Sequence, residues 1–268
     1  MNQGNSPADT KYRPRILAAC RLALHDGWDR LGLLIAVSLT FLSFLCLPAA
    51  VGYWVHKPVW LKIALLFLFS TPLPALFTGA CSQFHKMESG EEASWTGFLH
   101  DSVILFFPAV RLSIIHAAVD TSLGVNLVFY LSFLQKDPLV LLFIILWGYI
   151  SLLWTLMSLY LFPLLALQEY GGFDEPDRAA KRGVLAAYRR AFYLAIGSIP
   201  YSIGALIASL FIILICLISK ALIALLLIGA LSLQLTIAAR VQLAGYGIVS
   251  PPLTDGDPPE NAPWLVKK

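Results

Sequence analysis

Four side chains with chemical potential lie close together in one long apolar segment, namely Arg111, Ser113, His116 and Asp120. On a helix, Ser113, His116 and Asp120 are three and four residues apart and therefore share one face. Ionisable groups inside an apolar segment usually face a helix bundle or a wet cavity, where they serve transport or proton relay. His116 could accept a proton, bind a metal or ligate a haem-type cofactor. It could equally do no more than satisfy Asp120.

The rest of the sequence contains no familiar catalytic signature. HExxH, GxSxG, GxxxxGK[ST] and a GxGxxG after a strand are all absent. A lone histidine is poor evidence for a metal site, and the four cysteines are too widely separated to form a CxxC pair. We therefore predict a protein that is not an enzyme and that holds no metal and no cofactor.

Composition assigns the chain to a membrane. Hydrophobic residues make up 58% of it and charged residues 13%, and the mean hydropathy is +0.75. Soluble domains carry about 25% charged residues. The net charge of +3 is not gathered into a basic stripe with interleaved aromatics, so we expect no nucleic-acid partner.

Apolar segments that exceed the thickness of a bilayer fix the architecture. The 57 residues from Ala191 to Gly247 contain only two charges, Lys220 and Arg240. Because about 20 residues cross a bilayer, this stretch must cross it twice. The same pattern upstream predicts an all-α integral membrane bundle with about six spans. The predicted spans are residues 31–54, 60–80, 104–134, 138–167, 191–217 and 221–247.

The distribution of lysine and arginine predicts the orientation of this bundle. With the N-terminus inside, fourteen of the 19 basic residues lie on the cytoplasmic side and four on the outer side, with Arg111 unassigned. This bias favours a multi-pass protein of the cell membrane with both termini in the cytoplasm. Residues 14–248 form the single membrane domain. We expect residues 1–13 to be disordered and the proline-rich tail 249–268 to be flexible.

Short amphipathic helices are predicted on the cytoplasmic side. Residues 14–27 have apolar positions at helical spacing, and Ser89 with Glu92 fits a capping box. A further helix is predicted from Asp174 to Arg190. Its basic side chains, which we expect to contact anionic lipid or a partner, are Arg178, Lys181, Arg182, Arg189 and Arg190.

The two larger cytoplasmic segments share one plan. A span with a late proline, Pro74 or Pro163, is followed by a polar loop, a capped helix and the next span. This recurrence suggests a diverged parallel repeat.

The second half of the chain resembles the YesL-type bacterial membrane proteins. The resemblance rests on LYLFPLLALQ at 159–168, followed by a short acidic loop, a basic helix and two closing spans. In the first half, PALFTG at 74–79 before Lys86 also fits, whereas the separate first span and its loop to Trp60 depart from the pattern. Members of that family are small multi-pass proteins often associated with carbohydrate-uptake transporters. The resemblance transfers no catalytic residue.

These observations favour an accessory or assembly subunit of a larger membrane complex, such as a sugar-type ABC transporter. Its expected partners are the lipid bilayer and other membrane subunits or copies of itself. Two alternatives stay open. One is a small permease with its polar site in the third span, and the other is a cofactor-binding subunit of an energy-conserving complex.

Overall fold

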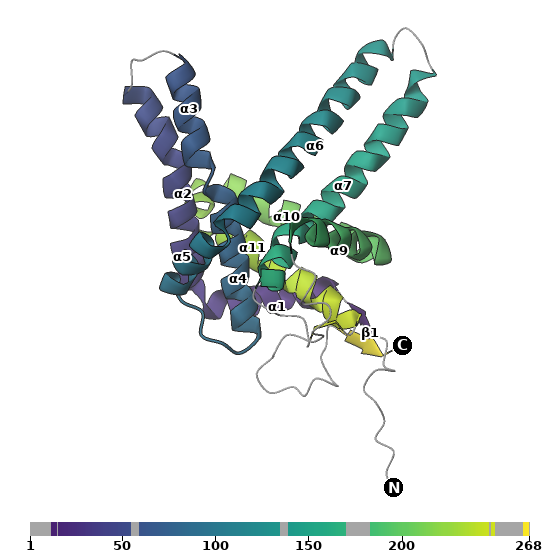
Figure 1. Ribbon diagram of the computed structural model, residues 1–268. Helices are drawn as coiled ribbons and strands as arrows, with labels where there is room; N and C mark the ends of the chain where they lie inside the picture. Colours follow the sequence, from purple (N-terminus) through teal and green to yellow (C-terminus); the bar gives the residue numbers. More distant parts are fainter. Residues whose placement is uncertain are drawn as a thin grey trace.

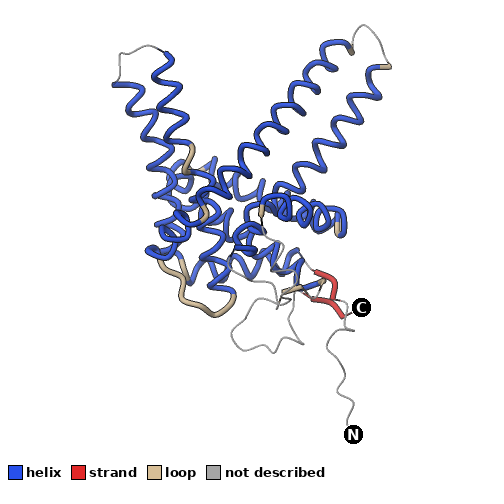
Figure 2. Tube along the Cα trace, in the orientation of Figure 1, coloured by secondary structure: helices blue, strands red, loops and turns tan. Residues whose placement is uncertain are grey.

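The computed structural model confirms an all-α fold built from apolar helices (Figures 1 and 2). It describes residues 12–14, 16–54, 59–134, 139–169, 183–246, 248–249 and 265–267. The helices are α1 (Ile16–Asp29), α2 (Leu31–Trp54), α3 (Val59–Ser70), α4 (Leu73–Glu88), α5 (Trp95–Ile104), α6 (Phe106–Phe133), α7 (Val140–Glu169), α9 (Val184–Gly197), α10 (Ile199–Ile218) and α11 (Lys220–Gly245).

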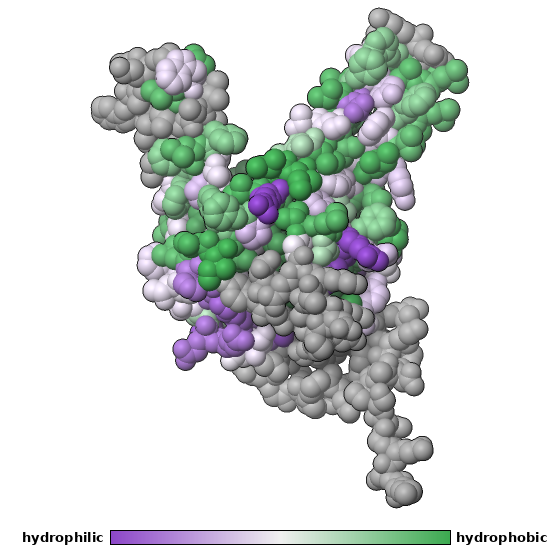
Figure 3. Space-filling view, viewed as in Figure 1, coloured by the Kyte–Doolittle hydropathy of each residue, from purple (hydrophilic) through white to green (hydrophobic). Residues whose placement is uncertain are grey.

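Two helical hairpins rise from a common body and diverge from each other, so that the molecule is V-shaped (Figure 1). Helices α2 and α3 form one hairpin, and α6 and α7 form the other. The remaining helices make up the body, with α5 and α9 on opposite sides of it. Hydrophobic side chains cover most of the described surface of the hairpins, as a bilayer requires (Figure 3).

Four of the described helices are long and apolar enough to cross a membrane. They are residues 106–133, 140–168, 199–218 and 226–245. A fifth span results if the bent pair of α1 and α2 is counted as one, because these helices meet at 89°. The predicted span at 31–54 coincides with α2. Within the described residues there are thus four such helices, or five with the bent pair, where about six spans were predicted.

The predicted span at 60–80 is wrong, because two helices replace it. Helix α3 has only 12 residues and ends at Ser70, and α4 starts at Leu73 after a break. Pro72 and Pro74 cause the break, since proline has no N–H for the preceding turn and is favoured at the start of a helix. Helix α4 then buries polar residues within the body instead of exposing an apolar surface.

Short helices also precede two of the predicted spans. Helix α5 ends at Ile104, and α6 begins after a break at Leu105. The predicted span at 191–217 starts inside α9, which ends at Gly197 before α10 begins. Pro200 in the first turn of α10 explains this break, as it cannot donate to a preceding carbonyl.

The predicted capping box at Ser89 is also wrong. Ser89 lies at the C-terminal end of α4, where its hydroxyl donates to the carbonyl oxygen of His85 (3.0 Å). The N-cap of α5 is Ser94, whose Oγ accepts a hydrogen bond from the backbone N–H of Gly97 (3.0 Å). Five residues, 89–93, separate the last residue of α4 from this cap.

Helix α11 is the centre of the fold. Every residue from 232 to 244 is buried, and the helix packs against α1, α2, α4, α7 and α10. At Gly229 it approaches α2 so closely that an added Cβ would lie 2.6 Å from the carbonyl oxygen of Leu34. The Gly229 N–H donates to Ser38 Oγ (2.9 Å), which fixes this crossing.

The two ends of the chain meet in a pair of antiparallel strands. β1 (Tyr12–Pro14) pairs with β2 (Leu265–Lys267), so that Tyr12 lies opposite Lys267. At these segments extended pairing replaces the predicted disorder and flexibility, because each strand satisfies the backbone groups of the other. The pairing places both ends on the same side of the body. The rest of the two predicted tails lies outside the described residues, apart from Ile248 and Val249.

Candidate functional site

The polar cluster predicted in the third span is assembled between α6 and α7. His116 Nε2 lies 3.3 Å from Asp120 Oδ2, one turn along α6. Two side chains of α7 complete the cluster. Ser158 Oγ lies 3.1 Å from His116 Nε2, and Trp154 Nε1 donates to Asp120 Oδ1 (2.8 Å). The histidine and the acid are therefore joined to each other and to a second helix.

Aromatic rings hold this cluster against α9. The ring of Trp154 stacks on His116 (5.1 Å between centroids) and on Tyr188 of α9 (5.6 Å). The Tyr188 hydroxyl donates to the carbonyl oxygen of Leu112 (3.3 Å). Burial and the nearby Asp120 carboxylate raise the pKa of Tyr188 to about 12, so that it stays a hydrogen-bond donor at neutral pH.

The other two residues of the predicted site do not join it. Arg111 is exposed near the start of α6 and makes no ion pair with any described residue. Ser113 is partly buried, and its Oγ has no hydrogen-bond partner among the described residues. The site therefore consists of His116 and Asp120 with Trp154, Ser158 and Tyr188, rather than of all four residues on α6.

Asp120 stays open to the surroundings despite these contacts. Its side chain is 52% exposed, whereas that of His116 is 19% exposed. The exposed residues Ala117, Thr121 and Gly124 adjoin it along α6, and an added Cβ at Gly124 would meet no atom within 4 Å. A half-exposed acid thus borders a face of small side chains.

The predicted basic surface is only partly described. Arg178, Lys181 and Arg182 lie outside the described residues. Arg189 is exposed on α9, with its guanidinium 5.8 Å from the ring centroid of Tyr193. Arg190 is partly buried and turns inward toward Gln168 at the end of α7. Membrane or partner contact through this basic set stays a prediction.

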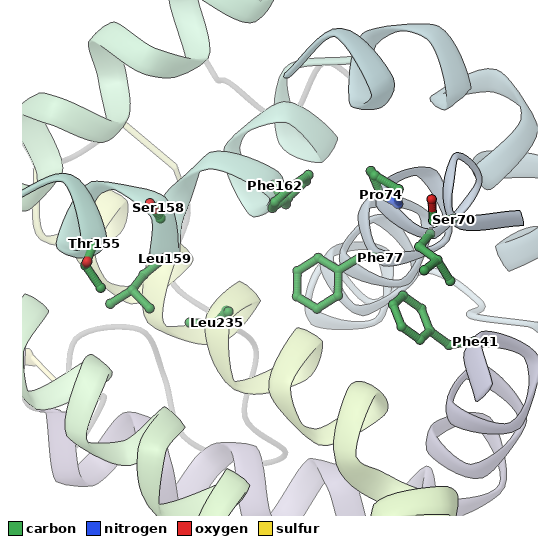
Figure 4. Close-up of a pocket in the computed structure, with 10 residues that line it drawn as sticks. Phe41, Ser70, Pro74, Phe77, Thr155, Ser158, Leu159, Phe162 and Leu235 are labelled. Carbon is green, nitrogen blue, oxygen red and sulfur yellow. The ribbon is translucent and has the colours of Figure 1, made fainter. Parts of the chain in front are cut away.

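An open cleft of about 530 Å³ lies between the two hairpins (Figure 4). Its lining comes from α2, α3, α4, α7 and α11. The lining residues are Phe41, Ser70, Leu73, Pro74, Phe77, Thr155, Ser158, Leu159, Phe162 and Leu235. Ser158 belongs to both sites, because it lines the cleft and contacts His116.

The hydroxyl groups in this lining are already used within their own helices. Ser70 donates to the carbonyl of Phe67 (3.1 Å), and Thr155 donates to the carbonyl of Ser151 (2.9 Å). Ser158 donates to the carbonyl of Trp154 (2.8 Å). The cleft therefore presents an apolar wall, since hydroxyls bonded one turn back have no donor left for a ligand.

A second polar cluster, which the sequence did not reveal, is buried in the body. Arg240 of α11 donates through Nη1 to the His85 carbonyl and to Ser89 Oγ, both at 3.0 Å. Glu88, only 2% exposed, shares a hydrogen bond with the Asp26 carboxyl of α1. The Oε2 atom of Glu88 and the Nδ1 atom of His85 have no hydrogen-bond partner among the described residues.

Burial controls ionisation in this second cluster. It raises the pKa of Glu88 well above its ordinary value, and the neighbouring Asp26 carboxylate raises it further. Burial together with Arg240 lowers the pKa of His85 to about 3. Glu88 is therefore protonated and His85 neutral at pH 7. The sequence signal was Arg240, a charged residue well inside the apolar helix α11, but its partners are distant in the chain.

A buried ion pair lies beside this cluster. Lys86 Nζ contacts Asp101 Oδ2 of α5 (2.8 Å), and Asp101 also accepts from Ser82 Oγ (2.8 Å) and Gln83 Nε2. Asp101 is 1% exposed. These bonds join α4 to α5 and have a structural role.

Within the described residues, no group of three or more histidine, cysteine and acidic side chains is placed to hold a metal ion. The four cysteines are free. No protein-family model, characterised protein or solved structure matches the chain significantly.

Proposed function

We propose that the protein is a non-catalytic subunit of a larger membrane complex, and that a transmembrane helix of its partner packs on α6 around Asp120. Asp120 carries this proposal, because it is half exposed close to the midpoint of a 28-residue span. An acid near the centre of a bilayer costs about 2.5–3.5 kcal/mol on insertion scales. Trp154 and His116 satisfy only part of the carboxylate. A partner helix with a polar side chain would cover the rest.

The surface beside Asp120 suits a helix as its partner. Ala117, Thr121 and Gly124 are small and exposed at helical spacing, so that a second backbone can approach closely. Thr121 donates its hydroxyl to the Ala117 carbonyl (2.7 Å), which leaves its methyl group for packing. A partner helix with a serine, threonine, asparagine or lysine opposite Asp120 would fit this face best.

The cellular setting follows from the charge bias and the resemblance described above. The cell membrane, with both termini cytoplasmic, is the expected location because basic residues gather on that side. A carbohydrate transporter is the expected kind of complex, as in YesL-type proteins.

Site-specific photocrosslinking in living cells tests the proposal. A photoreactive phenylalanine analogue at Thr121 should crosslink to a second membrane polypeptide. The same analogue at Ile115 or Phe129 is the matched control, because these exposed residues lie on another face of α6. Crosslinks of equal yield at all three positions, or only to lipid, would remove the basis for a partner at this face.

A permease is the second candidate, and Ser158 favours it. This residue connects the apolar cleft to His116 and, through it, to Asp120. Such a link could couple proton binding to occupancy of the cleft. Uptake into reconstituted vesicles should then be lost in His116→Ala and in Asp120→Asn. Unchanged uptake in both variants would leave the cluster with a structural role.

A further inference from the structure

The same join between a long helix and a short one occurs twice in the body. Gln83, near the end of α4, accepts a hydrogen bond at Oε1 from the backbone N–H of Ser94, the residue before α5 (3.1 Å). Its amide nitrogen donates to the carboxylate of Asp101, seven residues beyond Ser94. Gln83 therefore ties the end of α4 to two points on the next short helix.

Gln168, near the end of α7, ties that helix to α9 in the equivalent way. With its amide oriented to satisfy both neighbours, its nitrogen donates to the Gly183 carbonyl (3.2 Å), and its oxygen accepts from Arg190 Nη1 (2.9 Å). Gly183 is the residue before α9, and Arg190 lies seven residues beyond it. The two glutamines therefore occupy equivalent positions, although the charge of the contacted side chain is reversed.

Residues at the same distance before Gln83 and Gln168 indicate an internal symmetry axis. Phe77 and Phe162 each lie six residues before their glutamine, and their rings contact each other edge to face with centroids 5.5 Å apart. In a two-fold arrangement, a residue contacts its own equivalent only beside the axis. Helices α4 and α7 both run from a hairpin into the body (Figure 1). The repeat is thus parallel, and its axis runs along the opening of the V.

The cleft lies on this axis, because equivalent residues face each other across it. The remaining equivalent pairs in its lining are Ser70 and Thr155, Leu73 and Ser158, and Pro74 and Leu159. Only Phe41 of α2 and Leu235 of α11 fall outside the pairing. Figure 4 shows Phe77 and Phe162 between the two walls. Whatever occupies the cleft is contacted by side chains at equivalent positions in both halves of the chain.

We infer that this cleft on the pseudo-two-fold axis is a binding site for the acyl chain of a bilayer lipid. The cleft of about 530 Å³ falls within the range of about 300–1,000 Å³ that is typical of small-molecule sites.

The chemistry of the walls selects an apolar chain over a polar solute. Each lining hydroxyl is bonded within its own helix, so that a sugar or an ion would lose its hydration without replacement. The opening lies between hairpins that carry apolar side chains, and a lipid chain can enter it from within the bilayer. This inference does not depend on the partner proposed for α6, which concerns another surface.

Photolabelling with a defined lipid tests the inference. The full-length protein is reconstituted with phosphatidylcholine that carries a diazirine in one acyl chain, and the labelled residues are mapped by mass spectrometry. Labelling should be enriched at Phe77 and at Phe162 relative to exposed positions on the outer faces, such as Phe107. Ser70→Phe and Thr155→Phe occupy equivalent positions, so each should lower the cleft labelling several-fold and to a similar extent.

The matched control is Leu146→Phe on the exposed surface of α7, which should leave the cleft labelling unchanged. The elution profile of each variant in detergent verifies its fold. The labelling map of the unmodified protein tests the inference even if a variant fails to fold. Uniform labelling of all exposed apolar residues would overturn the inference, as would labelling that survives both cleft variants. Absence of label from the cleft while the outer faces are labelled would overturn it too. None of these three results would affect the crosslink expected at Thr121.

Discussion

Replacing Glu88 by glutamine is expected to remove a pH dependence of stability that originates in the buried carboxyl pair. Glu88 is 2% exposed and hydrogen-bonded to Asp26, with Arg240 nearby on α11 and His85 on α4. Burial raises its pKa above the ordinary 4.5, so that the folded state keeps a proton that the unfolded chain releases. The contribution of Glu88 to stability is therefore greatest below about pH 4.5 and falls as the pH rises toward the folded pKa.

The size of this effect follows from the proton count. One extra proton in the folded state lowers the free energy of unfolding by at most about 1.4 kcal/mol per pH unit. His85, with its pKa lowered to about 3, affects stability only below about pH 7.5, because above that it is neutral in both states. Between pH 7.5 and 8.5 His85 no longer contributes, so that the part of the slope that Glu88→Gln removes reports on Glu88. Glutamine can still donate to Asp26, so that Glu88→Gln should be more stable than the wild type at pH 8.5.

Chemical unfolding in detergent micelles, followed by tryptophan fluorescence across this interval, measures the effect. Glu91→Gln is the control, because Glu91 is exposed in the loop between α4 and α5 and should leave the slope unchanged. A Glu88→Gln variant with the same pH slope as the wild type would refute the reasoning. So would a variant that is less stable than the wild type at pH 8.5.

Three further predictions concern packing and polar contacts. Gly229→Ala should destabilise the fold by about 1–3 kcal/mol, as overpacking does, because the added Cβ would meet the Leu34 carbonyl. Gly32→Ala is the control, because nothing lies within 4 Å of a Cβ added there. Equal unfolding midpoints for the two variants would contradict this prediction. Asp101→Ala should lower the free energy of unfolding by about 3–5 kcal/mol in the same assay, since it leaves the buried Lys86 ammonium without this carboxylate. A decrease of less than about 1 kcal/mol would show that the ion pair contributes little to stability. Trp154→Phe keeps a ring beside His116 but removes the donor to Asp120, and it should destabilise the fold by about 0.5–1.5 kcal/mol in the same unfolding assay. An unchanged unfolding midpoint would mean that the indole does not hold Asp120.

Hydropathy predicted the fold class and the long helices correctly because a bilayer imposes the same requirement on every span. The span at 31–54 matches α2, and the runs around His116 and Trp154 match α6 and α7. Hydropathy did not predict that the apolar run at 60–80 is broken. Its prolines were visible, but proline is tolerated in spans, so that only packing decided between a kink and a new helix.

The candidate site was predictable only along one helix. Periodicity placed His116 and Asp120 on one face, and the structure confirms their contact. The partners on α7 could not be assigned, because the register between two helices depends on side-chain packing that a sequence does not display. The buried cluster of Glu88 and Arg240 was hidden for the same reason, since the two residues lie more than 150 positions apart.

The repeat illustrates how geometry adds to sequence. The plan shared by the segments after Pro74 and Pro163 suggested duplication, but the two copies differ at almost every residue. The equivalent hydrogen bonds of Gln83 and Gln168 show how the two copies of the repeat align, which their residue identities do not reveal.

Purification from native membranes tests the central claim, that α6 packs on a partner helix in a membrane complex. The protein is extracted in a mild detergent, and the mass and composition of the eluting species are determined for the wild type and for Thr121→Trp, with Phe129→Trp as the control. We expect the wild type and the control to elute with a stoichiometric membrane partner that Thr121→Trp loses while its own fold is intact. A wild-type protein that elutes without any membrane partner, or a partner retained equally by Thr121→Trp, would contradict the account.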